Sequence, residues 1–273
     1  MVLSKVRKPV VAGQFYPSSA EQLKKQIELL IDKKAAKKDA IACMLPHAGY
    51  IYSGKVAGST LSEINIKDKV ILLGPNHTGF GAHFSIMTEG VWQTPLGEVK
   101  IDSDLAKEIL KNSKYLKDDA AAHVSEHSLE VELPFLQYFK ADFQIVPIAF
   151  LSDEVEALKN VGSEIAQVIQ RLRIKESIMI AASSDMTHYE PERQAYKKDN
   201  EAITAILELN EDKLVEKIAD LNISMCGYAP VIVMITLAKA LGAKSGRLVK
   251  YQTSGDITGD TDSVVGYAGI VID

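Results

Sequence analysis

The sequence predicts an α/β protein of three layers, with a central, mostly parallel sheet that is flanked by helices on both faces. Short apolar runs typical of buried strands alternate with longer segments whose apolar residues have helical spacing. No Pro-, Gly- or Ser-rich linker and no fixed-period repeat divides the 273 residues. We therefore expect one domain over residues 1–273. The hydrophobic fraction of 47% is ordinary for a globular protein.

The predicted strands are short runs that are rich in Ile and Val and bounded by polar or turn residues. The four that we expect to be buried in a parallel sheet are residues 41–45, 70–73, 145–150 and 178–182. A hairpin and two tail strands are predicted at residues 92–95, 98–101, 247–251 and 264–272. The Gly/Asp/Ser/Thr-rich segment 253–262 is predicted as a loop.

Helices are predicted between the strands, where apolar residues recur at helical spacing. They cover residues 22–32, 56–64, 103–110, 130–139, 154–171, 192–209, 211–219 and 231–241. Ser18 and Glu21 have the spacing of a capping box before the first helix. The last helix is the most apolar, but it is shorter than the about 20 residues that span a bilayer. We therefore expect it to be buried and expect no membrane partner.

Charge and cysteine content bear on partners and compartment. The formal net charge is −5, and a basic stripe typical of nucleic-acid binding is not evident. Cys43 and Cys226 lie far apart in the chain and do not make a disulfide framework. The N-terminal segment lacks the continuous apolar region of a signal peptide. These features predict a cytoplasmic protein without a nucleic-acid partner.

Three of the predicted strands run into a polar segment with a histidine, namely His47, His77 and His188. Because the carboxyl ends of parallel strands meet at one edge of a sheet, where ligands bind, we expect these side chains to converge. Imidazole is a common ligand of Fe, Cu and Zn. One such histidine could simply cap a turn, but three at equivalent strand ends favour a metal site.

Cys226 and Asp185 are further candidates. Cys226 precedes the apolar helix at 231–241, and a helix dipole lowers the pKa of a nearby thiol and so favours a metal-binding thiolate. The residues alone fit a small buried cysteine equally well. Asp185 lies three residues before His188, where it can orient or tune this histidine as a general acid or base, or cap the following helix.

Residues 123–127 (HVSEH) match the H-x-x-E-H pattern of inverted zinc peptidases. That chemistry needs two histidines on one helical face, and residues 117–122 have no helical apolar stripe. We therefore do not favour a peptidase, although Glu126 and His127 can reach the pocket from the loop before the next helix. The chain lacks G-x-G-x-x-G, Walker, C-x-x-C and G-x-S-x-G motifs, which leaves dinucleotide, nucleotide and serine-hydrolase functions without support.

Six segments, in chain order, carry a resemblance to a known family: AGQFYP (12–17), PHAGY (46–50), GPNH (74–77), EHSLE (126–130), SSDMTH (183–188) and CG (226–227). The chain resembles the Memo family, of the AmmeMemoRadiSam system protein B type, over almost its whole length. The resemblance implies a fold like that of class III (LigB-type) extradiol dioxygenases, whose iron(II) is held by two histidines and a carboxylate. It also implies a functional link to radical-SAM and AMMECR-type proteins.

Carried over position by position, the resemblance implies that His47 and His77 are metal ligands. It implies that Cys226 takes the place of the carboxylate ligand and that His188 is the acid/base residue. Because a thiolate is softer than a carboxylate and suits iron, copper or zinc, we expect Fe(II), with Cu or Zn as alternatives.

Two functions follow as hypotheses. The first is a non-haem iron redox enzyme that acts on a small molecule, with His188 and Asp185 as its catalytic residues. The second is a non-catalytic module that binds a peptide or protein in the same cleft; a metal-dependent hydrolase is a weaker third. The residues that we expect to contact the ligand are Tyr16, Tyr50, Glu126 and His127, and Tyr189 is a further aromatic candidate.

Overall fold

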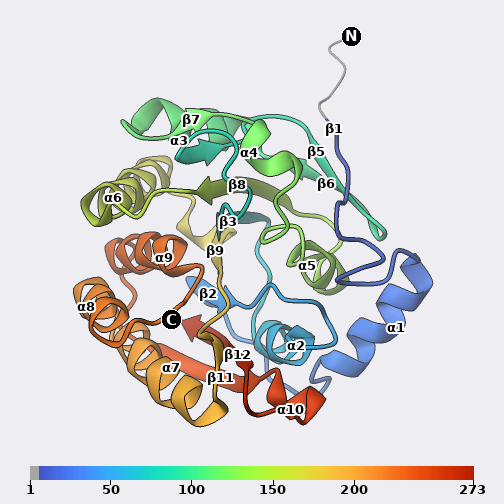
Figure 1. The fold of residues 1–273 in the computed structure, drawn as a ribbon. Helices are drawn as coiled ribbons and strands as arrows, with labels where there is room; N and C mark the ends of the chain where they lie inside the picture. Colours follow the sequence, from blue (N-terminus) through green and yellow to red (C-terminus); the bar gives the residue numbers. More distant parts are fainter. Residues whose placement is uncertain (1–5) are drawn as a thin grey trace.

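The computed structural model describes residues 6–273 as one twelve-stranded sheet with helices on both faces (Figure 1). Its centre consists of four parallel, buried strands that lie side by side. In spatial order these are β8 (Gln144–Phe150), β3 (Lys69–Pro75), β9 (Ile178–Ser183) and β2 (Ala42–Leu45). They coincide with the four predicted apolar runs, so the prediction of a mostly parallel central sheet is confirmed.

Antiparallel strands extend the sheet beyond β2. β12 (Val264–Ile272) pairs with β2, and β11 (Gly246–Thr253) and β10 (His188–Glu190) pair with β12. On the other side, the start of β8 pairs with β6 (Gly97–Ile101), which forms the predicted hairpin with β5 (Val91–Thr94). The remaining strands are β1 (Val6–Arg7), β4 (Phe84–Ile86) and β7 (Lys117–Asp118).

The helices form two outer layers (Figure 1). One face carries α3 (Ser103–Asn112), α6 (Val155–Leu172), α7 (Glu192–Leu207), α8 (Glu211–Leu221) and α9 (Tyr228–Ala240). The other carries α1 (Ala20–Leu30), α2 (Gly54–Ser62) and α5 (Leu133–Phe139). The short elements are α4 (Ala121–Val124), α10 (Gly255–Thr258) and the 3₁₀ turn η1 (Lys175–Ser177). The three-layer α/β prediction is therefore confirmed.

The chain connections decide which loops meet. α2 connects β2 to β3 on one face, and α6 connects β8 to β9 on the other, in the opposite direction along the sheet. This is the arrangement that right-handed crossovers require. As a result, β3, β9 and β2 are neighbours, and the segments that follow them begin at the same edge.

Two local predictions need correction. Ser18 does not cap α1: the N-cap residue is Ser19, whose side chain makes no capping hydrogen bond, and the Glu21 carboxylate pairs with Lys25 one turn further along instead. The predicted loop at 253–262 contains the short helix α10. No helix within residues 6–273 is both long and apolar enough to cross a membrane.

Candidate metal centre

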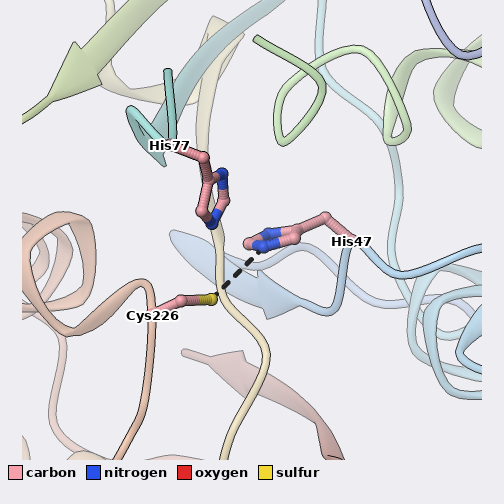
Figure 2. Close-up of side chains that lie close together, drawn as sticks. All are labelled: His47, His77 and Cys226. Atoms are coloured by element: carbon pink, nitrogen blue, oxygen red, sulfur yellow. Dashed lines mark hydrogen bonds between the residues drawn. The ribbon is translucent and has the colours of Figure 1, made fainter. Parts of the chain in front are cut away.

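Three candidate ligands from distant parts of the chain meet at the carboxyl edge of the sheet. His47 follows β2, His77 follows β3 and Cys226 precedes α9. Figure 2 shows both imidazole rings and the sulfur directed towards one another. Their ligand atoms all lie within 4.8 Å of one another, and Cys226 Sγ is 3.3 Å from His47 Nε2. Nitrogen and sulfur ligands of one tetrahedral zinc ion would be about 3.5 Å apart, so this set fits a single metal ion.

Glu126 orients His77. Its Oε1 accepts the Nδ1–H of His77 at 2.9 Å, and its Oε2 accepts the main-chain N–H of the same residue. Although burial acts to raise it, the hydrogen bond and charge of His77, the N–H of Ser128 and the charge of His127 lower the pKa of Glu126 to about 2. Because an ionised carboxylate holds the proton on Nδ1, the Nε2 atom of His77 is left free for a metal.

Ser183, the last residue of β9, orients His47. Its Oγ lies 2.7 Å from His47 Nδ1 and 2.8 Å from the carbonyl oxygen of Ser128. Because a carbonyl only accepts, the Ser183 hydroxyl donates to Ser128 and accepts the Nδ1–H of His47. Burial, followed by the nearby His77 and His127, lowers the pKa of His47 well below its ordinary value. His47 is therefore a neutral imidazole whose unprotonated Nε2 faces Cys226 Sγ, and the neutral form is the one that binds metal ions.

Ser128 links the two histidine segments. Its Oγ donates to the carbonyl of Pro75, two residues before His77, and its own carbonyl accepts the bond from Ser183. Sequence reasoning did not select Ser128 or Ser183 as site residues. Their only signal was their position within the EHSLE and SSDMTH segments. The segment around Ser128 thus supports both histidines on the side away from the candidate ligand atoms, through Pro75 and Ser183.

Cys226 is held close to β9 by the glycine that follows it. A Cβ atom built at Gly227 would lie 2.3 Å from the carbonyl oxygen of Ser183. The predicted lowering of the thiol pKa is wrong here: burial, and next the charge of Asp185, raise the pKa of Cys226 above its ordinary value. A coordinating metal ion deprotonates a thiol outright, so the donor set still fits a metal.

Asp185 and His188 lie on the segment after β9. Asp185 Oδ1 accepts the main-chain N–H of His47 at 2.9 Å, so this carboxyl supports the His47 loop. Burial raises the pKa of Asp185 to about 6, against the lowering effect of that hydrogen bond. His188 Nδ1 lies 3.0 Å from the carbonyl of Ser224, which only accepts. The proton of neutral His188 is therefore on Nδ1, and its Nε2 is a free acceptor.

A cavity of about 430 Å³ adjoins these groups. It is lined by His47, His77, His127, Asp185, His188 and the aromatic side chains Phe15, Tyr52, Tyr189 and Tyr267. A larger hollow, of about 680 Å³, lies near Lys69 and Gln144 at the amino ends of β3 and β8. Its lining contains no histidine or cysteine, so the smaller cavity is the one that adjoins the candidate ligands.

The structure does not place Tyr16 and Tyr50 at this cavity. Both are buried in the core: the Tyr50 hydroxyl donates to the carbonyl of Val131 at 2.8 Å, and that of Tyr16 donates to Glu130. Aromatic walls come instead from their neighbours Phe15 and Tyr52, together with Tyr189 and Tyr267. Of these, only Tyr189 was among the aromatic candidates.

His127 lies at the cavity and stacks on His77, with ring centroids 4.8 Å apart. His77, Glu126 and His127 also have ligand atoms within 4.8 Å of one another. However, the Glu126 carboxylate already accepts N–H groups from His77, His127 and Ser128. His123 is fully buried in α4 against Trp92, and α4 ends at Val124, before His127, so the two-histidine helical face of a peptidase is not formed.

Comparison with known proteins agrees with this arrangement of motifs. Residues 7–271 match the family profile described as Memo-like protein. A MEMO1 family protein of Methanocaldococcus jannaschii is 42% identical, with 99% of this chain and 100% of the relative covered. Another, from Aquifex aeolicus, is 46% identical, with coverage of 98% and 99%. A third, from Methanopyrus kandleri, is 43% identical, with coverage of 97% and 98%.

Proposed function

The chain belongs to the Memo family, and from this premise we propose that it is a metal-binding redox protein in which His47, His77 and Cys226 hold one Fe(II) ion. One observation carries the proposal. The ligand atoms of these three residues lie within 4.8 Å of one another, while the Nδ1 atom of each histidine is engaged by an orienting partner. Ligands that are oriented from behind in this way are typical of metal centres.

The donor set limits the choice of metal. Two imidazoles and a thiolate suit iron, copper or zinc. The resemblance to extradiol dioxygenases favours iron, and copper and zinc are the alternatives. Because Cys226 stands where those enzymes have a carboxylate, ring cleavage is not part of the proposal.

Bound Fe(II) supplies open coordination positions and an electron for oxygen or for a reducible small molecule. The residues of the chain supply the remaining functions. The free Nε2 of His188 accepts a proton at the cavity, because its Nδ1–H is held by Ser224. Phe15 and Tyr52 form apolar walls, and the volume of about 430 Å³ suits a small molecule.

Metal analysis tests the proposal. The protein would be purified without oxygen and without a metal-binding tag, and its metals measured by mass spectrometry. We expect near-stoichiometric iron that is lost in His47→Ala, His77→Ala and Cys226→Ser. His83→Ala is the matched control, because His83 is exposed and does not line the cavity. Absence of metal, or metal content indifferent to the three substitutions, would refute the proposal.

A binding module on the same fold is the second candidate. Two exposed aromatic side chains favour it, since Tyr189 is 78% exposed and Tyr52 is 41% exposed at the cavity. A peptide array probed with the native protein and with His77→Ala would test it: equal retention of the same peptides supports binding without metal, and lost retention opposes it.

We also propose a functional link to radical-SAM and AMMECR-type proteins. This part of the proposal rests on family membership alone.

A metal-dependent hydrolase is a weaker third candidate. Such an enzyme needs a base to activate water. Asp185 is the one carboxylate that lines the cavity within residues 6–273, and it is engaged by the main chain of His47. No observation specifically favours hydrolysis.

A further inference from the structure

Three glutamates between residues 126 and 132 are almost completely buried, but their partners differ. Glu126 accepts several N–H groups, and Glu130 pairs with the guanidinium of Arg7. Within residues 6–273, the carboxyl group of Glu132 has one hydrogen-bond partner, Ser183 Oγ at 3.1 Å. Its Oε2 has no partner among the residues that the structure describes. Glu132 therefore lacks the cation or N–H groups that keep a buried carboxylate ionised.

The hydrogen bonds of Ser183 Oγ determine where the protons lie. Three groups surround this oxygen: His47 Nδ1, the Ser128 carbonyl and Glu132 Oε1. A hydroxyl has one proton to donate and accepts two hydrogen bonds. Since the carbonyl only accepts, all three contacts are satisfied when Ser183 donates to Ser128, and His47 and Glu132 both donate to Ser183.

An ionised Glu132 fits less well. It would take the Ser183 proton away from the Ser128 carbonyl and leave a charged, unpartnered oxygen in the core. The titratable groups that face it are Cys43, Tyr50 and Asp185, none of which is a cation. Burial raises the pKa of Glu132 well above its ordinary value.

We propose that Glu132 is a neutral carboxylic acid that acts through Ser183 as a positioning residue for His47. The two histidines are then supported differently: His77 by the ionised carboxylate of Glu126, and His47 by an uncharged hydroxyl and an uncharged acid. The protonation state is inferred from the hydrogen-bond geometry and the burial of Glu132, without reference to a metal, whereas the effect on the metal rests on the proposed function. Because a carboxylate partner raises the basicity of an imidazole, His77 is the stronger donor of the two.

Infrared spectroscopy tests the protonation state without any metal. The native protein, Glu132→Gln and Glu126→Gln would be compared in H₂O and D₂O near pH 7. We expect a C=O stretch of a protonated carboxyl group that disappears in Glu132→Gln and persists in Glu126→Gln. A difference spectrum between native protein and Glu132→Gln that contains only carboxylate bands would overturn the inference.

Metal affinity tests the positioning role. Zn(II) and Fe(II) dissociation constants would be measured by chelator competition, alongside Tm. The Gln amide still donates to Ser183, so Glu132→Gln should bind within about 3-fold of the native protein, while Glu132→Leu should bind about 10–100-fold more weakly. The positioning role would be overturned if a folded Glu132→Leu bound metal as tightly as the native protein. It would also be overturned if Glu132→Gln and Glu132→Leu lost metal affinity equally. If the native protein itself binds no metal, the proposed function fails, and the infrared result still decides the state of Glu132.

Discussion

Ser224 holds His188 through hydrogen bonds to both its main chain and its ring. The main-chain N–H of His188 donates to Ser224 Oγ at 2.7 Å, and its Nδ1–H donates to the Ser224 carbonyl at 3.0 Å. Ser224 precedes Cys226 by two residues, so the segment that brings the sulfur to the site also orients the candidate acid/base residue. The proposed ligand and the proposed proton acceptor therefore share one support.

Replacement of His188 by Ala should separate chemistry from metal binding. We expect the variant to keep its iron but to consume oxygen, with a supplied reductant, about 100-fold or more slowly than the native protein, because the proton acceptor at the cavity is lost. An oxygen electrode and metal analysis of the same samples measure both. Tyr189→Phe is the matched control, since it changes a neighbouring side chain at the cavity and keeps His188. Unchanged oxygen consumption in His188→Ala would remove this histidine from the chemistry.

Replacement of Glu126 by Gln should lower the metal affinity, because His77 loses the carboxylate that orients it. An amide cannot accept all the N–H groups that Glu126 accepts from His77, His127 and Ser128. We expect the metal dissociation constant to rise about 10–100-fold. Chelator competition checks this, with the exposed Glu98→Gln as the control. Equal affinities for the two variants would show that His77 does not depend on this carboxylate.

Replacement of Gly227 by Ala should disturb Cys226 selectively. The new Cβ would meet the Ser183 carbonyl oxygen at 2.3 Å and the Ser184 Cβ at 2.5 Å, so the segment before α9 must move away from β9. We expect the free energy of unfolding to fall by about 1–3 kcal/mol. Metal content should fall as well, because the sulfur is carried outwards. Urea unfolding and metal analysis test this, and a variant that matches the native protein in both would contradict the close approach.

The buried His123 should make stability depend on pH. Burial, and next the positive charge of Arg7, lower the pKa of His123 to about 4 from its ordinary 6.5. Because the unfolded chain then binds the proton at a higher pH than the folded protein, the contribution of His123 to stability is lost as the pH falls from about 6.5 to about 4. Below about pH 4 this contribution changes no further. The contribution is about 3 kcal/mol over this interval.

Urea unfolding of the native protein and of His123→Leu, at about pH 7 and pH 4, isolates this contribution. We expect the native protein to lose about 3 kcal/mol more than the variant. Parallel losses in the two proteins would show that the pKa of His123 is the same in the folded and unfolded states, and so is not lowered by burial.

The residue pattern was enough to predict the central strands and the sheet edge at which the two candidate histidine ligands lie. The runs at 41–45, 70–73 and 178–182 are too short for helices and have the apolar composition typical of buried strands, and a histidine follows each one. Because parallel strands end at one edge, His47 and His77 had to lie near each other once these strands were neighbours. Local pattern and sheet topology were sufficient for this part.

Which aromatic side chain of each turn reaches the cavity depends on packing between distant segments, and the residue pattern could not predict it. Tyr16 and Tyr50 are directed into the core while Phe15 and Tyr52 line the cavity, since residues one or two positions apart in a turn can point in different directions. Tertiary structure also decided the supports of the histidines. Ser128 and Glu132 are far from Ser183 in the sequence, and a hydrogen bond between distant segments leaves no periodic signal. The raised pKa of Cys226 likewise follows from burial, which depends on the whole fold rather than on the residues beside the cysteine.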